Sequence, residues 1–479
     1  MQSAGQSESW EDRRKFVKLG IAGLAGAGAV ALLNPISARA VTTPVGPVTN
    51  TVRKEGTNFI SQDDSGNDVS SGPNFATVLQ NAIDNLPAAG GTIILKKSLG
   101  TVPVNNTVFW RVNKPIVLLG EAWGVTLQPT VSPMFSLPGV GWSDSQGILA
   151  CVWANFRIDC QFLPTAGRAI DGQYVFDFVF DHMELLNVPA GRRGISIVPG
   201  QIGSFRNIKA NNGNGPADLI YLDTSGGNGS NMAFYDCAFG TSGPTSQGVN
   251  VGGFHISFHN CHFANTRVQV RDASSSINFE NCMFESASTL PLINAQVAFI
   301  GCQFSGNVHD EFDAPKEVIY AGFGASLSMV GCKFGQTGSP LTGDCALRLS
   351  EGHISVDMVG CTAFVSPENG PYASGFFRDL IPPVGRDPNV VRQFSSRMEA
   401  AGSRLCNQGK FTSILPQLTY EIPHGLAASP DTDSGTILVT PGSADAKGDF
   451  YVTADQTKIY VTYAVAPASV NLRWYAQVL

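Results

Sequence analysis

Short runs that alternate apolar and polar residues recur through the middle of the chain, where helical periodicity is absent. The run from Ile256 to Cys261 and the run from Leu327 to Cys332 are two examples. Period-two alternation predicts β-strands. Each run ends at a Cys-x-Phe triplet or an apolar equivalent. These anchors are Cys160-Gln-Phe162, Met183-Glu-Leu185, Ile208-Lys-Ala210, Cys237-Ala-Phe239, Cys261-His-Phe263, Cys282-Met-Phe284, Cys302-Gln-Phe304, Cys332-Lys-Phe334 and Cys361-Thr-Ala-Phe364.

The nine anchors follow one another at intervals of 20 to 30 residues. A repeat of variable length in this range predicts a solenoid whose turns carry loops of different size. Asn, Gly or Asp usually stands directly before the Cys, and these residues accommodate a bend between two strands. A second family of short strands lies between the anchors, so each turn holds at least two strands. Its members are residues 194–197, 219–222, 249–251, 268–270 and 347–349.

This pattern resembles the right-handed parallel β-helix of the pectate-lyase and polygalacturonase superfamily. Residues 75–86, followed by 89–95, look like the capping helix and first strand of that family, and residues 115–121 are similar to its Gly-Glu strand end. The resemblance implies an all-β fold of about 9–11 coils over residues 57–375, after a linker at 41–56. The Asp-rich stretch at 63–68 departs from the Gly-Asp-Gly of the family. This departure weakens any assignment to a particular branch of the superfamily, but it leaves the predicted fold intact.

The last part of the chain predicts a small antiparallel β domain. Short strands at 436–440, 450–453, 459–463 and 472–475 are separated by Gly, Pro and Asp, which is typical of a small sandwich. We therefore assign residues 413–479 to a β-sandwich-like accessory domain, and residues 376–412 to a linker or covering segment with a short helix at 389–401. Trp474 and Tyr475 could stack on sugar rings, but adjacent strand residues face opposite sides, so at least one should pack in the core.

Composition and charge narrow the class of partner. The chain has 479 residues, 14% of them charged and 43% apolar, enough apolar material for a long core. Residues 1–40 hold five basic and three acidic residues; without them 26 basic and 35 acidic residues remain, a net charge of −9. Neutralising phosphates requires a broad basic face, so nucleic acid is not an expected partner.

The first forty residues have the form of an export signal. Arg13-Arg14-Lys15-Phe16 precedes an apolar stretch at 19–33 and then Ala38-Arg39-Ala40, a small-residue cleavage site. The Arg pair resembles the twin-arginine signal, although Asp12 departs from that pattern. Fifteen apolar residues fall short of the ~20 that span a membrane. The sequence thus predicts a secreted, extracellular or periplasmic protein without a membrane span.

The cysteines are expected to stack as thiols rather than to pair. Ten Cys in an exported chain would ordinarily suggest disulfides. The regular column already explains most of them, and a buried free Cys behaves as a small hydrophobe. Export by the twin-arginine route would also place folding in a reducing compartment. Any bridge should involve Cys151, Cys345 or Cys406, which lie off the column.

Two outward columns are candidates for ligand contact. The first lies two residues before each anchor and turns from polar to aliphatic, which predicts a cover, for example the segment after 365. Its members are Asp181, Arg206, Tyr235, His259, Glu280, Ile300, Val330 and Val359. The second follows the other strand family, over which the related enzymes commonly carry their substrate groove. Its members are Asp171, Ser196, Tyr221, Asp223, Asn250, Gln269, Arg271 and Arg348.

The second column admits two chemistries. A uronate lyase needs a group that neutralises the carboxylate and a base, roles that Arg271 and Tyr221 could fill beside Asp171 and Asp223. An inverting hydrolase needs two carboxylates about 6.5–9.5 Å apart. Asp171 and Asp223, two coils apart at about 4.8 Å a coil, would stand near 10 Å. The Asp-Asp pair and Gly-His-Gly of the polygalacturonases, and the Arg motif of the classical pectate lyases, are missing from the coils.

Metal binding is a weaker hypothesis. His255, His259 and His262 fall in one turn and, with Glu280 and Asp181, could form a metal or acid-base cluster. A solvated ladder of alternating charges is the favoured explanation, since such ladders are common and no zinc spacing is present. The acidic insert His309-Asp-Glu-Phe-Asp313 could hold calcium, or form a solvated loop.

The function that these observations favour is binding, with cleavage by a lyase or glycoside hydrolase or with epimerisation, of an acidic extracellular polysaccharide. We assign catalytic roles to Asp171, Tyr221, Asp223 and Arg271. We assign substrate binding to Asp181, Arg206, Tyr235, His259, Glu280, Asn250 and Gln269. The alternative is a non-catalytic β-helix that serves as adhesin, tailspike-like receptor binder or cell-surface matrix protein, for which a homotrimer would be in keeping.

Overall fold

The computed structural model describes residues 49–477 with short gaps. The gaps are 113, 142–146, 213–216, 224–229, 241–247, 272–275, 286, 290–291, 293–294, 306–316, 336–344, 350–352, 364–376, 379–389, 395–396, 399–405, 425, 427–428 and 431–436. The chain divides into two units, residues 1–277 and 278–479. The export signal expected at 1–40 and the acidic insert at 309–313 lie outside the described residues.

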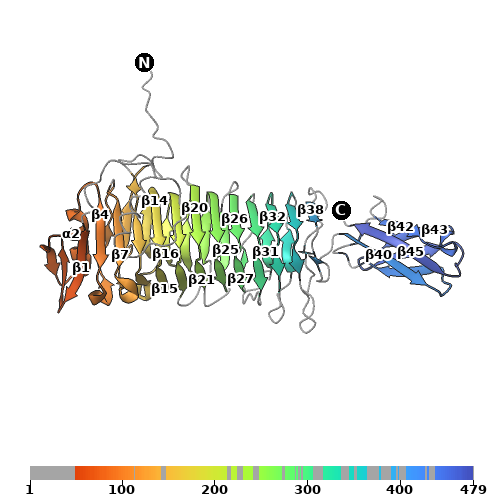
Figure 1. Ribbon diagram of the computed structural model, residues 1–479, viewed down its shortest axis with the longest axis horizontal. Helices are drawn as coiled ribbons and strands as arrows, with labels where there is room; N and C mark the ends of the chain where they lie inside the picture. Colours follow the sequence, from red (N-terminus) through yellow and green to blue (C-terminus); the bar gives the residue numbers. More distant parts are fainter. Residues whose placement is uncertain are drawn as a thin grey trace, which may run out of the picture. The chain divides into compact units, whose positions relative to one another are not determined.

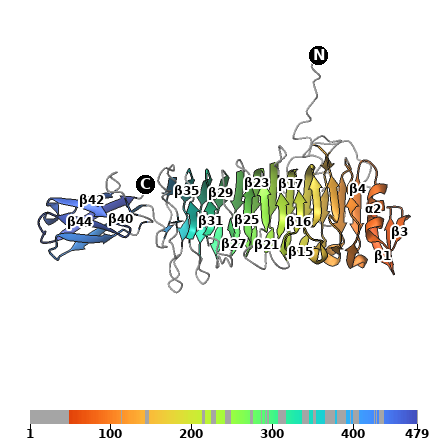
Figure 2. The same ribbon diagram turned by 180° about the vertical axis from the view of Figure 1, so that it is seen from behind.

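The first unit is a parallel β-helix of three sheets (Figures 1 and 2). The first sheet holds β1 (Thr49–Glu55), β2 (Asn58–Gln62), β3 (Asp68–Gly72), β4 (Gly91–Leu95), β7 (Ile116–Gly120), β10 (Ile148–Leu149), β11 (Val152–Ala154), β14 (Val175–Asp181), β17 (Gly200–Arg206), β20 (Ser230–Tyr235) and β23 (Phe254–His259). The second holds β5 (Thr101–Val104), β8 (Thr126–Pro129), β12 (Arg157–Asp159), β15 (Glu184–Val188), β18 (Lys209–Asn212), β21 (Ala238–Gly240) and β24 (His262–Ala264). The third holds β6 (Val108–Phe109), β9 (Phe135–Pro138), β13 (Arg168–Gln173), β16 (Arg193–Ile197), β19 (Asp218–Leu222), β22 (Val249–Gly252) and β25 (Arg267–Arg271).

A single residue in the left-handed region turns the chain from the first sheet to the second in coil after coil. Asn207, Asp236 and Asn260 have φ of 51°, 54° and 53°. Asn and Asp adopt this conformation more readily than other residues with a Cβ. The Asn260 Nδ2 also donates to the Asp236 Oδ1 of the preceding coil, 3.2 Å away. The bend predicted from the residues before the cysteines is thereby confirmed, with its hydrogen bonding along the stack.

Inward side chains stack from coil to coil. Phe205, Phe234 and Phe258 occupy the same register, with ring centroids 4.4 Å apart in each successive pair and nearly parallel planes. Next to them Phe239 lies over Phe263, 5.5 Å away. All five rings are buried. The strand spacing of about 4.8 Å sets this distance, so identical residues at one register position necessarily form a column.

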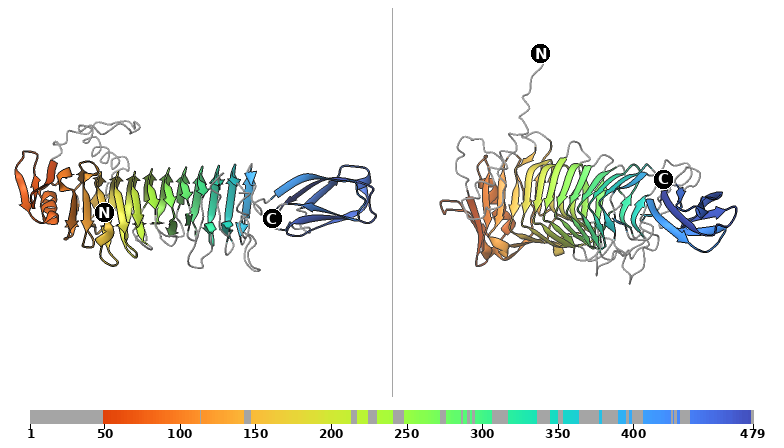
Figure 3. Two further views of the ribbon diagram at one scale, coloured as in Figure 1. Left: turned by 90° about the horizontal axis from the view of Figure 1, so that it is seen from below. Right: turned by 45° about the vertical axis from the view of Figure 1, so that its right-hand side comes forward.

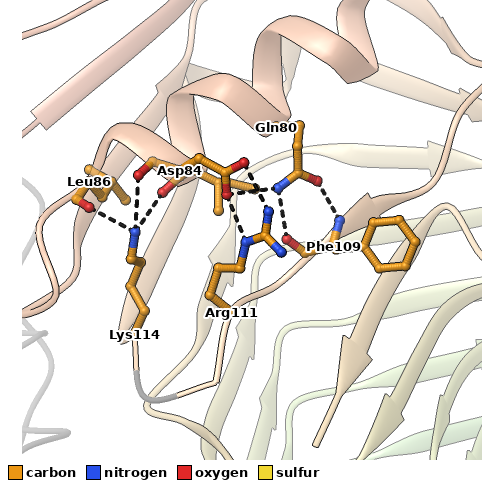
Figure 4. Close-up of polar contacts among 7 residues, drawn as sticks. Gln80, Asp84, Leu86, Phe109, Arg111 and Lys114 are labelled. Carbon is orange, nitrogen blue, oxygen red and sulfur yellow. Dashed lines mark hydrogen bonds and ion pairs between the residues drawn. The ribbon is translucent and has the colours of Figure 1, made fainter.

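The expected capping helix is α2 (Phe75–Asn85), whose Asn74 side chain accepts the backbone N–H of Thr77. Three short 3-10 turns, η2 (Lys97–Leu99), η3 (Ala122–Gly124) and η4 (Cys160–Phe162), also lie in this unit. Figure 4 shows how the first coil holds the end of α2. Lys114 Nζ donates to the carbonyl oxygens of Leu86 and Ile83 at 2.7 and 3.1 Å, which satisfies groups that a helix end leaves without partners.

Side chains of the same loop hold the outer face of α2. Arg111 makes two hydrogen bonds to the Asp84 carboxylate, of 2.7 and 2.9 Å. The Gln80 Oε1 accepts the backbone N–H of Phe109 at 2.7 Å (Figure 4). The Arg111 hydrogen bond lowers the pKa of Asp84, and burial lowers the pKa of Lys114. Ion pairing and hydrogen bonds therefore hold the capping helix in place, in addition to the burial of its apolar face.

The prediction that Cys160-Gln-Phe162 is an inward anchor is wrong. Cys160 is buried, but the triplet forms η4, and Phe162 is 56% exposed. Ile158 pairs with Leu185 in the second sheet, so Phe156 and Ile158 are the inward pair of that coil, and both are fully buried. The alternation Phe-Arg-Ile was missed because it lacks a Cys and because a Cys-x-Phe match follows it a few residues later.

The coils of the second unit follow the same strand pattern. Its first-sheet strands are β26 (Ser276–Glu280), which begins in the first unit, β29 (Gln296–Ile300), β32 (Ser326–Val330), β35 (Ser355–Val359) and β38 (Val390–Phe394). The others are β27 (Met283–Glu285), β28 (Ser288–Thr289), β30 (Gln303–Ser305), β31 (Glu317–Ala321), β33 (Lys333–Phe334), β34 (Cys345–Leu349), β36 (Thr362–Ala363), β37 (Phe377–Arg378) and β39 (Arg397–Met398).

The coils extend beyond the expected boundary at residue 375. Strand β38 pairs in parallel with β35, and β39 with β36, in the register of the earlier coils. Strands therefore replace the helix expected at 389–401, and they add a coil where residues 376–412 were expected to form a linker or cover. The deciding factor is edge pairing: β35 offers an open row of backbone donors and acceptors, which the next extended segment fills.

The thiol ladder is confirmed for the described cysteines. Eight of them are free and buried, Cys151 included. Five thiols on the column donate to a carbonyl of the preceding coil, as Cys302 does to Phe279 at 3.2 Å and Cys332 to Phe299 at 3.2 Å. Contact with the neighbouring thiol and burial raise the pKa of Cys302 and Cys332 to about 12. The side chains of Cys345 and Cys406 lie outside the described residues.

A β-sandwich follows, in which two antiparallel sheets enclose one core (Figure 3). One sheet is β40 (Cys406–Ser413), β45 (Val470–Gln477) and β42 (Ile437–Pro441), and the other is β41 (Thr419–Pro423), β44 (Lys458–Tyr463) and β43 (Phe450–Ala454), with η5 (Asp445–Lys447) between strands. The sandwich begins at Cys406 rather than 413. Trp474 packs in the core whereas Tyr475 is 37% exposed, as the alternation along a strand requires.

Candidate functional site

The first outward column of the first unit is assembled by register. Asp181 pairs with Arg206, Arg206 with Tyr235, and Tyr235 with His259, on β14, β17, β20 and β23. We call these four residues the first-sheet column. Tyr235 is 37% exposed, and the other three are partly exposed. The alternation of the sequence alone predicts this column, and the register places its members one strand apart.

Within the first-sheet column the side chains stack along the coil axis. The Arg206 guanidinium lies 5.8 Å from the centroid of the Tyr235 ring, which is within the range of a cation–π contact. The Tyr235 ring stacks on the His259 ring at 5.0 Å with planes 9° apart. Beside them the Asp181 carboxylate contacts the His182 Nδ1 at 2.8 Å. The column thus presents a cation and two aromatic rings in a row.

The corresponding column of the second unit is aliphatic. Ile300 pairs with Val330 and Val330 with Val359, and the three are 43%, 41% and 41% exposed. Glu280, assigned to substrate binding, ends β26 and is partly exposed. The switch from polar to aliphatic predicted from sequence is therefore present. No described segment covers the three aliphatic residues to the point of burial.

The second outward column is also in register. Asp171 pairs with Ser196, Ser196 with Tyr221, Tyr221 with Asn250, and Asn250 with Gln269. We call these five residues the third-sheet column. Ser196 and Asn250 are fully buried and Tyr221 is 6% exposed, so these positions are less open than a solvated face would be. Large side chains from the start of each strand cover them.

Three residues that the sequence analysis did not single out provide this cover. Arg168, Arg193 and Asp218 begin β13, β16 and β19 and pair with one another in register. Arg193 Nε donates to Asp218 Oδ2 at 3.1 Å, and its guanidinium carbon lies 3.4 Å from the Tyr221 ring centroid. Arg168 donates to Asp171 Oδ1 at 2.7 Å. The sequence does carry a signal for these three residues, because each stands three residues before a member of the third-sheet column.

The candidate carboxylates differ in their surroundings. Asp171 is held by Arg168, whereas Asp223 accepts the Tyr221 hydroxyl at 3.1 Å. Asp171 is level with Tyr221 two coils on, so Asp223 lies two residues farther along the strand. Two coils and two residues give a backbone separation of about 12 Å. This separation exceeds the roughly 10 Å expected from the height of two coils alone. It also exceeds the spacing of an inverting hydrolase, so it weakens the case for a two-carboxylate hydrolase.

The other candidates are dispersed. Arg271 ends β25 and pairs with Gly252, but its side chain lies outside the described residues. In the second unit, Arg348 lies 4.7 Å over the Tyr320 ring, which repeats the arginine–tyrosine contact of the first. Among the described residues no group of three or more His, Cys, Asp or Glu is arranged to hold a metal ion. Nor does any described helix have the length and apolarity needed to cross a membrane.

Comparisons with known proteins extend only to solved structures. No family model matches the chain, and no curated protein matches it. The chain is similar to ORF18 of Geobacillus virus E2, with 12% identity over 82% of this chain and 74% of that chain, and a TM-score of 0.42. It is similar to the tailspike gp49 of Pseudomonas phage LKA1, with 10% identity over 84% and 92% and a TM-score of 0.37. It is also similar to the surface adhesin PfbA of Streptococcus pneumoniae, with 11% identity over 67% and 87% and a TM-score of 0.33. At these identities and scores none of the three bears on the function of this chain.

Proposed function

We propose that this protein is exported and binds an acidic extracellular polysaccharide along the first-sheet column. The observation that carries the proposal is the stack of Arg206, Tyr235 and His259, in register on three successive coils, with Tyr235 exposed and the other two partly exposed. The Tyr235 ring lies between Arg206 and His259, so a ligand would meet the ring edges and the Tyr235 hydroxyl, which can hydrogen-bond to sugar hydroxyls. A guanidinium matches the geometry of a carboxylate. Coils about 4.8 Å apart repeat on the scale of a sugar unit, so one chain can contact several coils.

Arg206 supports an acidic ligand over a neutral one. Its Nε is buried and has no hydrogen-bond partner among the described residues. That atom is out of reach of an external ligand, but the outer guanidinium nitrogens can bind a carboxylate through two parallel N–H donors. A uronate carboxylate placed against the outer guanidinium nitrogens would engage a cation that the described protein leaves uncommitted. Asn250 and Gln269 belong to the third-sheet column and would contact the polymer only if it also reached that sheet.

Eliminative cleavage at the third-sheet column is the second candidate function. The observation that favours it is the Tyr221 hydroxyl, held 3.1 Å from the Asp223 carboxylate under the Arg193 guanidinium. In elimination a base removes the C5 proton of a uronate, the C4–C5 double bond forms, and the C4–O bond breaks as the leaving oxygen takes a proton. Arg193 or Arg271 would neutralise the uronate, with Tyr221 as the base. Returning the proton to the opposite face would give epimerisation instead.

The test uses the protein without residues 1–40 on a panel of uronate and neutral polysaccharides, with and without calcium. Binding is measured by calorimetry, and products are read as unsaturated sugars and as new reducing ends. Binding to a uronate polymer without products supports the proposed function in its non-catalytic form, as an adhesin or receptor binder. Unsaturated products support the lyase, and reducing ends without unsaturation support a hydrolase. Absence of binding to every uronate polymer contradicts the proposal.

Export by the twin-arginine route to the periplasm or beyond is part of the proposal. It rests on Arg13-Arg14 before the apolar stretch and on the thiol ladder, which requires free cysteines when the coils form. Replacing both arginines by Lys should retain the chain in the cytoplasm of its host, whereas export of that variant would contradict this route. Sedimentation of the purified chain decides between a monomer and a homotrimer.

A further inference from the structure

The outer face of one sandwich sheet carries an arrangement that the proposed function does not use. Along β41, β44 and β43 the inward residues form the core, among them Tyr420, Val461 and Tyr463. The alternate residues face outward. We call these outward residues the tyrosine face, which comprises Thr419, Glu421, Tyr451, Thr453, Lys458, Tyr460 and Thr462.

Two tyrosines lie diagonally on neighbouring strands of this face. Tyr460 pairs with Thr453, and Tyr451 stands two residues before Thr453 on the same strand. Diagonal neighbours in an antiparallel pair are about 7–8 Å apart, within reach of aromatic rings. Tyr451 is 62% exposed, an unusually open position for so large a side chain. Both rings therefore lie on the outward face rather than in the core, with Tyr451 exposed and Tyr460 partly exposed.

The polar groups around the rings are already oriented. The Tyr460 hydroxyl donates to Asp455 Oδ2 at 2.6 Å, and Asp455 also accepts the backbone N–H groups of Thr457 and Lys458 at 2.7 and 2.8 Å. This network lowers the pKa of Asp455 and raises the pKa of Tyr460. The Tyr460 hydroxyl is thereby fixed as a donor to Asp455, and its oxygen is left to accept from a ligand hydroxyl.

The charges of the face disfavour an acidic ligand. Lys458 pairs with Glu421 at 2.5 Å, so the charges of these two residues cancel. The Asp455 carboxylate then gives this part of the surface a net negative charge. On the opposite edge, the hydroxyls of Thr419 and Thr462 lie 3.1 Å apart and can exchange donor and acceptor roles. A surface that is slightly negative, rich in hydroxyls and aromatic complements a neutral ligand that presents hydroxyls and C–H faces together.

We propose that the tyrosine face binds a neutral glycan chain. Tyr451 supplies the stacking surface for one pyranose ring, and the Tyr460 hydroxyl, the threonine hydroxyls and the Glu421–Lys458 pair bind ring hydroxyls. The site goes beyond the proposed function, because the first-sheet column selects an acidic polymer by its guanidinium. The protein would then hold two chemically different glycans at separate surfaces.

The outer face of the other sandwich sheet provides the matched control. Tyr475 is 37% exposed there, and its hydroxyl donates to Gln477 at 2.7 Å. That face also bears the exposed Leu438, which pairs with Tyr475, and the cation Arg473. It therefore offers one tyrosine beside an apolar and a cationic residue, without a second ring on a neighbouring diagonal.

The experiment measures binding of the protein without residues 1–40 to neutral oligosaccharides of defined linkage by calorimetry. The probes are β-1,4- and β-1,3-glucans, xylan and galactan fragments, with a uronate polymer in parallel. We expect Tyr451→Ala to weaken binding of a neutral probe by about fivefold or more, since a stacked aromatic contributes on the order of 1 kcal/mol or more. Tyr460→Phe, which keeps the ring, should weaken it by about threefold through the lost hydroxyl. Tyr475→Ala should bind as the unaltered protein does.

Three outcomes overturn the inference. They are absence of binding to every neutral probe, equal effects of Tyr451→Ala and Tyr475→Ala, and loss of uronate-polymer binding in Tyr451→Ala together with loss of neutral binding. Tyr451 is exposed, so unchanged thermal unfolding should show that its variant folds. Loss of uronate binding only in variants of the first-sheet column would leave the inference intact, so it can fail separately from the proposed function.

Discussion

The guanidinium carbon of Arg193 lies 3.4 Å from the centroid of the Tyr221 ring, and the Arg193 Nε donates to Asp218 on the next coil at 3.1 Å. One arginine thus covers an aromatic ring that would otherwise face outward, and at the same time binds a carboxylate. The side chain of Arg193 is 28% exposed and that of Asp218 16%. Both contacts are consequently less screened by water than an ordinary surface pair.

Replacing this arginine by lysine should separate stacking from charge. Arg193→Lys keeps a cation for Asp218 but loses the planar group over Tyr221, because an ammonium cannot stack. We expect a loss of about 1–2 kcal/mol in the free energy of unfolding, measured in urea. Arg473→Lys, at an exposed position of the sandwich, should change it by less than about 0.5 kcal/mol. Equal effects of the two substitutions would contradict the role assigned to Arg193.

Tyr235→Ala should weaken binding of a uronate polymer by about fivefold, because it removes the ring between Arg206 and His259 and with it a contact worth on the order of 1 kcal/mol. The measurement is calorimetric titration. Val330→Ala provides the control, since Val330 is exposed on the corresponding outward column of the second unit and presents no ring or charge. Similar affinities for the two variants would argue against the first-sheet column as the binding surface.

The ion pair at the helix cap makes a contribution to stability that depends on pH. The hydrogen bond from Arg111 lowers the pKa of Asp84 below its ordinary 3.8. A lowered pKa means that the contribution is fully present above that ordinary value and is lost as the pH falls through the folded-state pKa. Asp84→Asn should therefore cost about 0.5–1 kcal/mol at pH 7, and progressively less as the pH falls through the folded-state pKa.

Urea unfolding of the parent and Asp84→Asn proteins between pH 2 and 7 tests this expectation. Asp64→Asn, at an exposed turn position, provides the control for removing a carboxylate as such. A difference between the parent and Asp84→Asn that stays constant over this range would show that the Asp84–Arg111 pair is not its source.

The thiol ladder should be inert in the folded protein. Cys302 and Cys332 are buried, with their pKa raised to about 12, so little thiolate exists at pH 8. We expect a thiol reagent to label them only as fast as the coils unfold, followed by mass spectrometry of peptides. Labelling at the rate of an unfolded control would contradict the stacked arrangement.

A serine in the ladder should destabilise it. Cys302→Ser places a stronger hydrogen-bonding group in a site lined by apolar side chains, where its one well-placed acceptor is the Phe279 carbonyl. A loss of about 1–2 kcal/mol is expected. Cys302→Ala removes the hydrogen bond and leaves a small cavity, at a cost of about 1 kcal/mol. A serine variant as stable as the parent would show that the column tolerates polar substitution.

The failure at Cys160 shows where sequence reasoning reaches its limit. A Cys-x-Phe match marks a strand only if the preceding residues alternate toward the same face, and the better alternation there is Phe156-Arg-Ile158. The strands at 390–394 and 397–398 were likewise missed, because their short pattern is also compatible with a helix turn. An open sheet edge decided between the two.

Periodicity determined the coils, the thiol column, the sandwich strands and the first-sheet column, whereas the capping helix was expected from the resemblance to a known β-helix family. The features that periodicity determined depend on side-chain spacing along a strand, which is fixed at two residues and readable from the chain. Only the tertiary structure determined which residues of successive coils pair and which side chains contact a neighbouring coil. It brought Arg168, Arg193 and Asp218 over the third-sheet column, and it moved Asp223 two residues past the level of Asp171. Such contacts join residues about 25 positions apart along the chain through loops of unequal length, and a sequence pattern does not specify which residues of successive coils lie side by side.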